Sequence, residues 1–169
     1  MIYLIWLLRI VHIVGGVIWV GGTLTMTFFI GPSIGATGEA GQKFVVHLMN
    51  NLKFSNRMSA AAGLTVLAGI ILYALDARAG AAWQRSGMGI GLSIGAVFAI
   101  IGFIFGILIG RTTNAMARLG TQFQGKPTSD QMNQMQAIRK QQALYSNISA
   151  AALILAVVFM ATARYLGMG

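Results

Sequence analysis

The chain has 169 residues, of which 56% are hydrophobic and only 9% are charged, and it carries a net charge of +9 and no cysteine. This composition excludes an ordinary soluble domain, because a helical bundle in water needs many charged residues on its outer faces. The lack of cysteine excludes disulfides, iron–sulfur clusters and thiolate metal sites. We expect the positive charge to contact anionic lipid headgroups rather than nucleic acid.

Long uncharged runs predict an all-α integral membrane protein. A bilayer core needs about 20 apolar residues per helix, and each run reaches that length. We expect a single four-helix, up-and-down transmembrane bundle with helical extensions on the cytoplasmic side. The lipid bilayer is its expected surrounding, and the predicted helices lie at about 2–30, 41–76, 87–119 and 129–166.

The first predicted helix contains two ionisable side chains, Arg9 and His12, in the run LLRIVHIVGGVIWVGG. It begins without a basic leader or a cleavage site after a short apolar core, so we expect a retained span and not a removed signal peptide. The segment GPSIGATGEAG is expected to end this helix, because its glycines and proline break helices.

The second helix is predicted to run without a break from near Gly41 to Asp76. His47 is the only other histidine, and in an unbroken helix it lies about 18 Å from the level of His12. One iron cannot bind both at that separation. We therefore interpret His47 as an interface residue or part of a separate site, unless the helix is broken near Asn50 and Asn51.

The third helix is rich in glycine, and many of its small residues are four positions apart. Small residues at this spacing let helix backbones approach closely in lipid. They predict packing within the bundle, or a homo-oligomer or larger membrane complex formed through this helix. The glycines concerned are Gly87, Gly91, Gly95, Gly102, Gly106 and Gly110. For the fourth helix, Thr128 or Ser129 is the expected N-cap.

The basic residues divide unequally between the two sides of the predicted bundle. Eight of the twelve lie between the first and second helices or between the third and fourth, whereas Arg9, Arg78, Arg85 and Arg164 lie toward the other side. By the positive-inside rule, loops 31–57 and 111–143 are cytoplasmic and both termini are outside. The expected location is a bacterial-type inner (plasma) membrane.

His12 is the leading candidate for a functional residue, because an ionisable side chain inside a span is costly and marks a site by default. Histidine ligates haem iron, and glycines on its face would leave room for the flat porphyrin. Arg9, one turn nearer the outer surface, could pair with a propionate. The residues that follow His12 and would line the ring are Gly15, Gly16, Trp19 and Gly22.

The second ligand of such an iron is less clearly indicated. Met58 and Met160 are candidates, since a thioether can be an axial ligand, and a five-coordinate iron is the other possibility. The residues also leave two alternatives open. One is copper, because His12 and the methionines are donors that suit Cu(I). The other is a structural role, in which His12 bonds to a neighbouring helix and the glycines serve close packing.

Carboxylates are scarce, and each lies near a predicted loop: Glu39, Asp76 and Asp130. A paired acid–base site within the membrane is therefore excluded, and so are the intramembrane acids that proton pumps use. We assign no catalytic residue. An enzyme built on this chain would have to be a haem-dependent membrane oxidoreductase.

The N-terminal half resembles the membrane domain of the copper-resistance D (CopD) family. The resemblance covers about residues 1–76 and rests on LLRIVHIVGGVIWVGG, FFIGPSI and LTVLAGIILY. A more distant similarity is to HemJ-type protoporphyrinogen oxidases, four-helix membrane proteins that bind haem b through a first-helix histidine. His12, Trp19 and Pro32 lie where that pattern places them.

The chain also departs from the HemJ pattern. That family has an arginine after the proline, where this chain has Ser33, and a lysine at the start of the third helix, where it reads GMGIGLSIG. Oxidation of protoporphyrinogen is therefore not expected. The prediction is a haem b-binding electron-transfer or accessory subunit of a membrane complex, with a copper-handling CopD-like protein and a cofactor-free packing subunit as alternatives.

Overall fold

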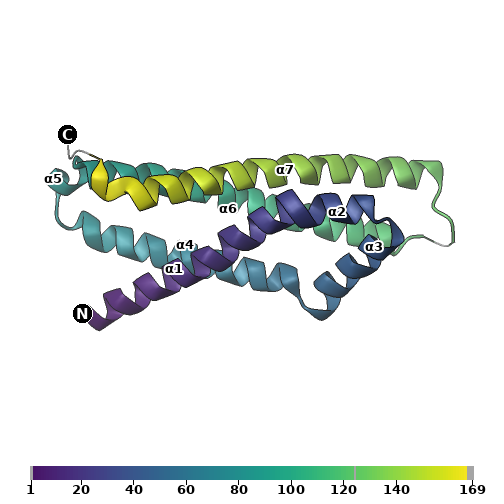
Figure 1. Ribbon diagram of the computed structural model, residues 1–169, viewed down its shortest axis with the longest axis horizontal. Helices are drawn as coiled ribbons and strands as arrows, with labels where there is room; N and C mark the ends of the chain where they lie inside the picture. The colour runs from purple at the N-terminus through teal and green to yellow at the C-terminus, as the bar shows by residue number, and fades with distance from the viewer. Residues whose placement is uncertain (1, 124, 167–169) are drawn as a thin grey trace.

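The computed structural model describes residues 2–123 and 125–166, which form an all-α bundle (Figure 1). Within these residues, four helical stretches are long and apolar enough to cross a membrane: Ile2–Ala36, Phe54–Ala77, Gly87–Gly120 and Ser129–Tyr165. The prediction of a four-helix, multi-pass membrane bundle is confirmed.

The first span is longer than predicted, because Gly31 and Pro32 do not end it. It consists of α1 (Ile2–Thr25), a π-helical turn (Met26–Ile30) and α2 (Gly31–Ala36). Pro32 comes just after the π-helical turn, in which the Gly31 N–H donates to the Met26 carbonyl five residues back. The wider π-helical turn before it accommodates the proline within a continuing helix.

The second predicted helix is broken, so the expectation of one helix over 41–76 is wrong. α3 (Glu39–Val46) continues into a π-helical turn (His47–Asn51), and α4 (Phe54–Ala77) begins after the break. At the break Lys53 has φ 50° and ψ 38°. This left-handed conformation costs an L-residue roughly 1–2 kcal/mol. As a result α3 packs back against α2 and does not extend α4 (Figure 1).

The remaining helices agree closely with their predicted bounds. A short α5 (Ala81–Gln84) precedes α6 (Gly87–Gly120) and α7 (Ser129–Thr162), and a 3₁₀ turn (Ala163–Tyr165) follows α7. Thr128 is the N-cap of α7, as predicted. Its Oγ1 accepts a hydrogen bond from the Gln131 N–H at 3.3 Å, and its own N–H donates to Oε1 of Gln131 at 2.9 Å. This reciprocal pair is a capping box.

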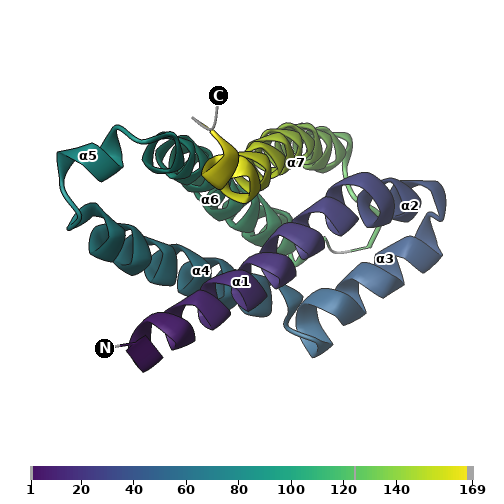
Figure 2. The ribbon, with the colours of Figure 1, turned by 60° about the vertical axis from the view of Figure 1, so that its left-hand side comes forward.

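The bundle is built from two helix pairs. α6 lies along α7 and α1 crosses α4, whereas the contacts between the pairs are sparser (Figures 1 and 2). The start of α1, the end of α7 and α5 lie at one end, and α2, α3 and the α6–α7 turn lie toward the other (Figure 1). Because the number of described spans is even, the start of α1 and the end of α7 lie on the same side.

The two pairs meet around Trp19, whose side chain is 4% exposed. Its ring meets the Phe103 ring edge-on, with centroids 6.0 Å apart. Ala61 of α4 and Leu153 of α7 belong to the same cluster. This contact fixes how α1 and α4 sit against α6 and α7.

Candidate functional site

His12 lies at the crossing of α1 and α4. Its Nδ1 is 2.8 Å from the backbone carbonyl oxygen of Thr65. A carbonyl only accepts hydrogen bonds, so Nδ1 carries the proton of this bond, and the atom left for a ligand is Nε2. Nε2 has no hydrogen-bond partner among residues 2–123 and 125–166. It is therefore the nitrogen available to a ligand.

The imidazole ring of His12 lies against Gly69, one turn beyond Thr65 on α4. A Cβ atom on Gly69 would be 2.8 Å from Cε1 and 3.0 Å from Nδ1 of His12. Only glycine leaves room for the ring at this position. We did not predict Thr65 or Gly69 as partners of His12. A polar and a small residue four apart on the second span were the signal available in the sequence.

Three glycines of α1, Gly15, Gly16 and Gly22, face α4 side chains, whereas Gly21 has no described atom within 4 Å of a Cβ. A Cβ on Gly15 would be 2.5 Å from Oγ1 of Thr65, and one on Gly22 would be 2.6 Å from Cε of Met58. A Cβ on Gly16 would be 3.6 Å from the Thr65 methyl group. Like other small residues in membrane helices, they allow two backbones to approach closely.

A porphyrin on this face of α1 would compete with side chains of α4. A macrocycle lying on the glycines would need the volume that Thr65 and Met58 occupy. The Met58 thioether lies beside Gly22, ten residues from His12 and hence about 15 Å along α1. It does not stand opposite the imidazole as a second axial ligand would.

The other predicted site residues do not join His12 in one site. Arg9 is exposed and makes no ion pair within the described part of the chain. Trp19 lies in the bundle core, and Met160 packs against Gly95 of α6. His47 lies before the break at Lys53, whereas His12 contacts α4 about three turns after it. The second predicted helix is broken, which was the condition for His47 to approach His12. The break nevertheless does not bring the two histidines together.

Histidine and carboxylate side chains do not form a cluster with His12. Within residues 2–123 and 125–166 there is no group of three or more His, Asp or Glu side chains that could hold a metal ion. Thr65 holds the His12 ring in one orientation.

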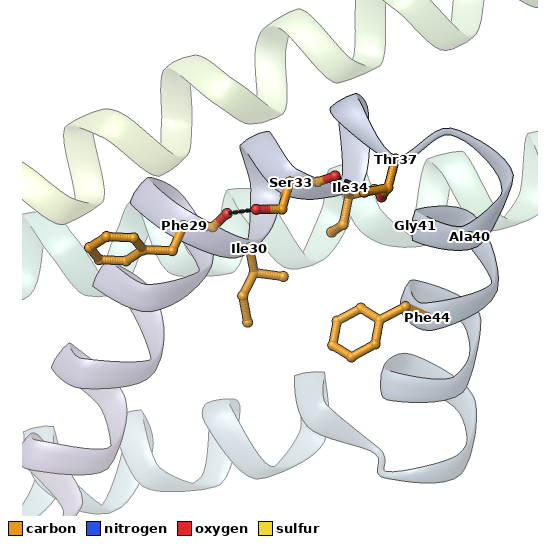
Figure 3. Close-up of a pocket in the computed structure, with 8 residues that line it drawn as sticks. All are labelled: Phe29, Ile30, Ser33, Ile34, Thr37, Ala40, Gly41 and Phe44. Atoms are coloured by element: carbon orange, nitrogen blue, oxygen red, sulfur yellow. Dashed lines mark hydrogen bonds between the residues drawn. The ribbon is translucent and has the colours of Figure 1, made fainter.

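An apolar pocket of about 360 Å³ lies between the end of the first span and α3 (Figure 3). Figure 3 shows Ile30 and Phe44 pointing into the space between the helices. Two hydroxyls in its wall are already used: Ser33 donates to the Phe29 carbonyl and Thr37 to the Ser33 carbonyl, each at 2.7 Å. The pocket therefore offers shape and apolar surface to a ligand, but little polar recognition.

Two sets of glycines on α6 differ in what lies beside them. Gly91, Gly95 and Gly102 face α7, where a Cβ would meet α7 or the 3₁₀ turn at under 3 Å. At Gly106 and Gly110, no atom of the described residues lies within 4 Å of such a Cβ. The first group serves packing inside the bundle, and the second leaves a strip of α6 open.

No protein-family model matches the sequence, and neither a curated protein nor a solved structure shows significant similarity to it. The resemblance to the CopD and HemJ families stays a prediction.

We predict that Gly69→Ala lowers the free energy of unfolding, whereas Gly63→Ala leaves it unchanged or raises it slightly. A methyl group on Gly69 collides with the His12 ring, but a Cβ on Gly63 has no described atom within 4 Å. Unfolding in sodium dodecyl sulfate, followed by circular dichroism, measures both variants. Both glycines lie in α4, so helix propensity affects them alike. Equal stability of the two variants would contradict the contact.

Proposed function

We propose that the chain is a structural packing subunit of a membrane assembly, without a cofactor between its helices. The observation that carries this proposal is the filled space beside its glycines. Thr65 fills the space at Gly15, and His12 fills the space at Gly69. Glycines in contact with a neighbouring helix support a packing role, because close backbone approach is what holds helices together in lipid.

The open strip of α6 at Gly106 and Gly110 is the surface proposed for assembly. These glycines have the four-residue spacing of membrane helix contacts, and α7 does not cover them. A second copy of the chain is the partner we propose, because symmetric homo-oligomers are the commonest assemblies.

Haem b bound through Nε2 of His12 is a second candidate. The hydrogen bond from Nδ1 to the Thr65 carbonyl favours it. Histidines that bind metals usually donate their other ring N–H to a carbonyl or carboxylate, which fixes the tautomer and the ring orientation. Because the glycine face is filled, such a haem would have to lie outside the α1–α4 contact.

The proposed orientation follows the distribution of charge. We assign the end with α2, α3 and the α6–α7 turn to the cytoplasm of a bacterial-type plasma membrane, since eight of the twelve basic residues lie in the segments there.

A difference spectrum separates the packing subunit from the haem protein. The full-length chain is expressed with haem supplied and purified in detergent, and its dithionite-reduced spectrum is compared with its oxidised spectrum. The packing proposal predicts no sharp α-band and neither iron nor copper near one per chain. An α-band that disappears in His12→Ala would overturn it and establish the haem candidate. Copper that falls in the same variant would establish a copper-handling protein.

The assembly surface is tested by placing a large side chain on α6. We expect Gly106→Leu to weaken self-association several-fold in analytical ultracentrifugation, because the new side chain keeps two backbones apart. Gly63→Leu on α4 is the matched control, since its Cβ is equally open. A wild-type chain that is monomeric in detergent and in bilayers, or a dimer indifferent to Gly106→Leu, would exclude this surface.

The lack of native cysteine makes the orientation testable by single-cysteine labelling. We expect Gln84→Cys in α5 to react with a membrane-impermeant maleimide on intact cells, and Lys126→Cys to react only after the membrane is opened. Both positions are exposed. The reverse pattern would mean that α2 and α3 lie outside.

A further inference from the structure

A second apolar groove, of about 490 Å³, runs between α1 and α4. On one side it is lined by Ile10, Val14 and Ile18, which are spaced at four residues along α1. Their side chains are 52%, 52% and 51% exposed, so the groove opens to the lipid and not to the interior of the bundle. On the other side it is lined by α4, including Leu64, which is 55% exposed.

One guanidinium group lies at one end of this groove. Arg57 is in the first turn of α4, one turn before Ala61 and two turns before Leu64, and all three line the groove. α4 has 24 residues and is therefore about 36 Å long, close to the roughly 30 Å of a bilayer core. Its first turn thus lies where headgroup phosphates are found. Leu64 lies about 10 Å deeper, at the level of the acyl chains.

Arg57 has no anionic partner in the described part of the chain. Glu39 forms an ion pair with Lys43 at 2.8 Å, and Asp76 lies at the opposite end of α4. Asp130 lies in the first turn of α7 and makes no ion pair with Arg57. An anion bound by this guanidinium would therefore come from outside the chain.

The groove differs in this respect from the pocket beside α3. There the wall hydroxyls bond to backbone carbonyls, and the charges of Glu39 and Lys43 neutralise each other. Beside α1 and α4, an apolar channel runs from an unneutralised cation at the headgroup level into the hydrocarbon. An apolar groove with a cation at its headgroup end matches a single lipid molecule that has an anionic headgroup and apolar chains.

We propose that this groove binds one anionic phospholipid from the leaflet at the α2–α3 end. Its phosphate contacts Arg57, and one acyl chain lies along α1 between Ile18 and Ile10. Basic sites between transmembrane helices are known to hold anionic headgroups. The inference is independent of the proposed function, because neither a cofactor nor a partner chain enters it.

Native mass spectrometry of the full-length chain, titrated with phosphatidylglycerol or phosphatidylcholine of identical acyl chains, tests the site. The wild-type chain is expected to bind phosphatidylglycerol more tightly. Arg57→Gln is expected to weaken that binding about five-fold and to leave phosphatidylcholine binding unchanged. Arg111→Gln is the matched control, because Arg111 is exposed in the half of α6 nearest the same end but does not line the groove.

The acyl-chain part of the proposal is tested by filling the groove. Val14→Trp is expected to lower the binding of both lipids, whereas Val97→Trp on α6, which is 56% exposed, is not. Thermal unfolding of each variant checks that it is folded. If Val14→Trp does not fold, the comparison of Arg57→Gln with Arg111→Gln still decides the test.

Three results would overturn the proposal. Equal binding of the two lipids to the wild-type chain would remove the role of charge. An equal loss in Arg57→Gln and Arg111→Gln would mean a diffuse positive surface. Competition by inorganic phosphate at the same concentration as the lipid would mean that the anion is free phosphate and that the apolar groove does not contribute.

Discussion

The close approach of α1 and α4 is the contact on which the rest of the structure depends. Lipid tails are as apolar as the helices, so the two gain little from the hydrophobic effect and are held by packing contacts and hydrogen bonds. Gly15 and Gly69 make the approach possible, and the bond from His12 to the Thr65 carbonyl forms at the same place. An apolar span can keep a histidine because its ring N–H is satisfied there.

This pairing also determines what the bundle leaves open. α1 is committed to α4, and it meets α6 and α7 mainly around Trp19. Away from that cluster the two pairs share few contacts. The groove along Ile10 and Ile18 lies at the edge of the α1–α4 contact, where it is lined by both helices and opens to the lipid. The proposed lipid-binding groove is thus a consequence of the pairing of α1 with α4. The open glycines of α6 belong to the α6–α7 pair.

The spans, the bounds of α6 and the cap at Thr128 follow from composition and local chemistry, which a sequence displays directly. The break at Lys53 does not, because neither glycine nor proline marks it and its left-handed backbone is imposed by the surrounding fold. Pro32 has the opposite effect: a strong helix breaker is tolerated just after the π-helical turn Met26–Ile30. The partners of His12 could not be predicted, since periodicity does not say which face of α4 meets α1.

The His12 bond to Thr65 has the same geometry in a metal site and in a helix contact, so on its own it does not distinguish them. The neighbouring glycines do distinguish them. A glycine kept for a cofactor would face a space that the cofactor alone can fill, whereas a Cβ on Gly15 would be 2.5 Å from Thr65 and one on Gly69 would be 2.8 Å from the His12 ring. A haem on Nε2 would then gain nothing from these glycines. The packing role accounts for the histidine and the glycines together, and the haem role accounts for the histidine alone.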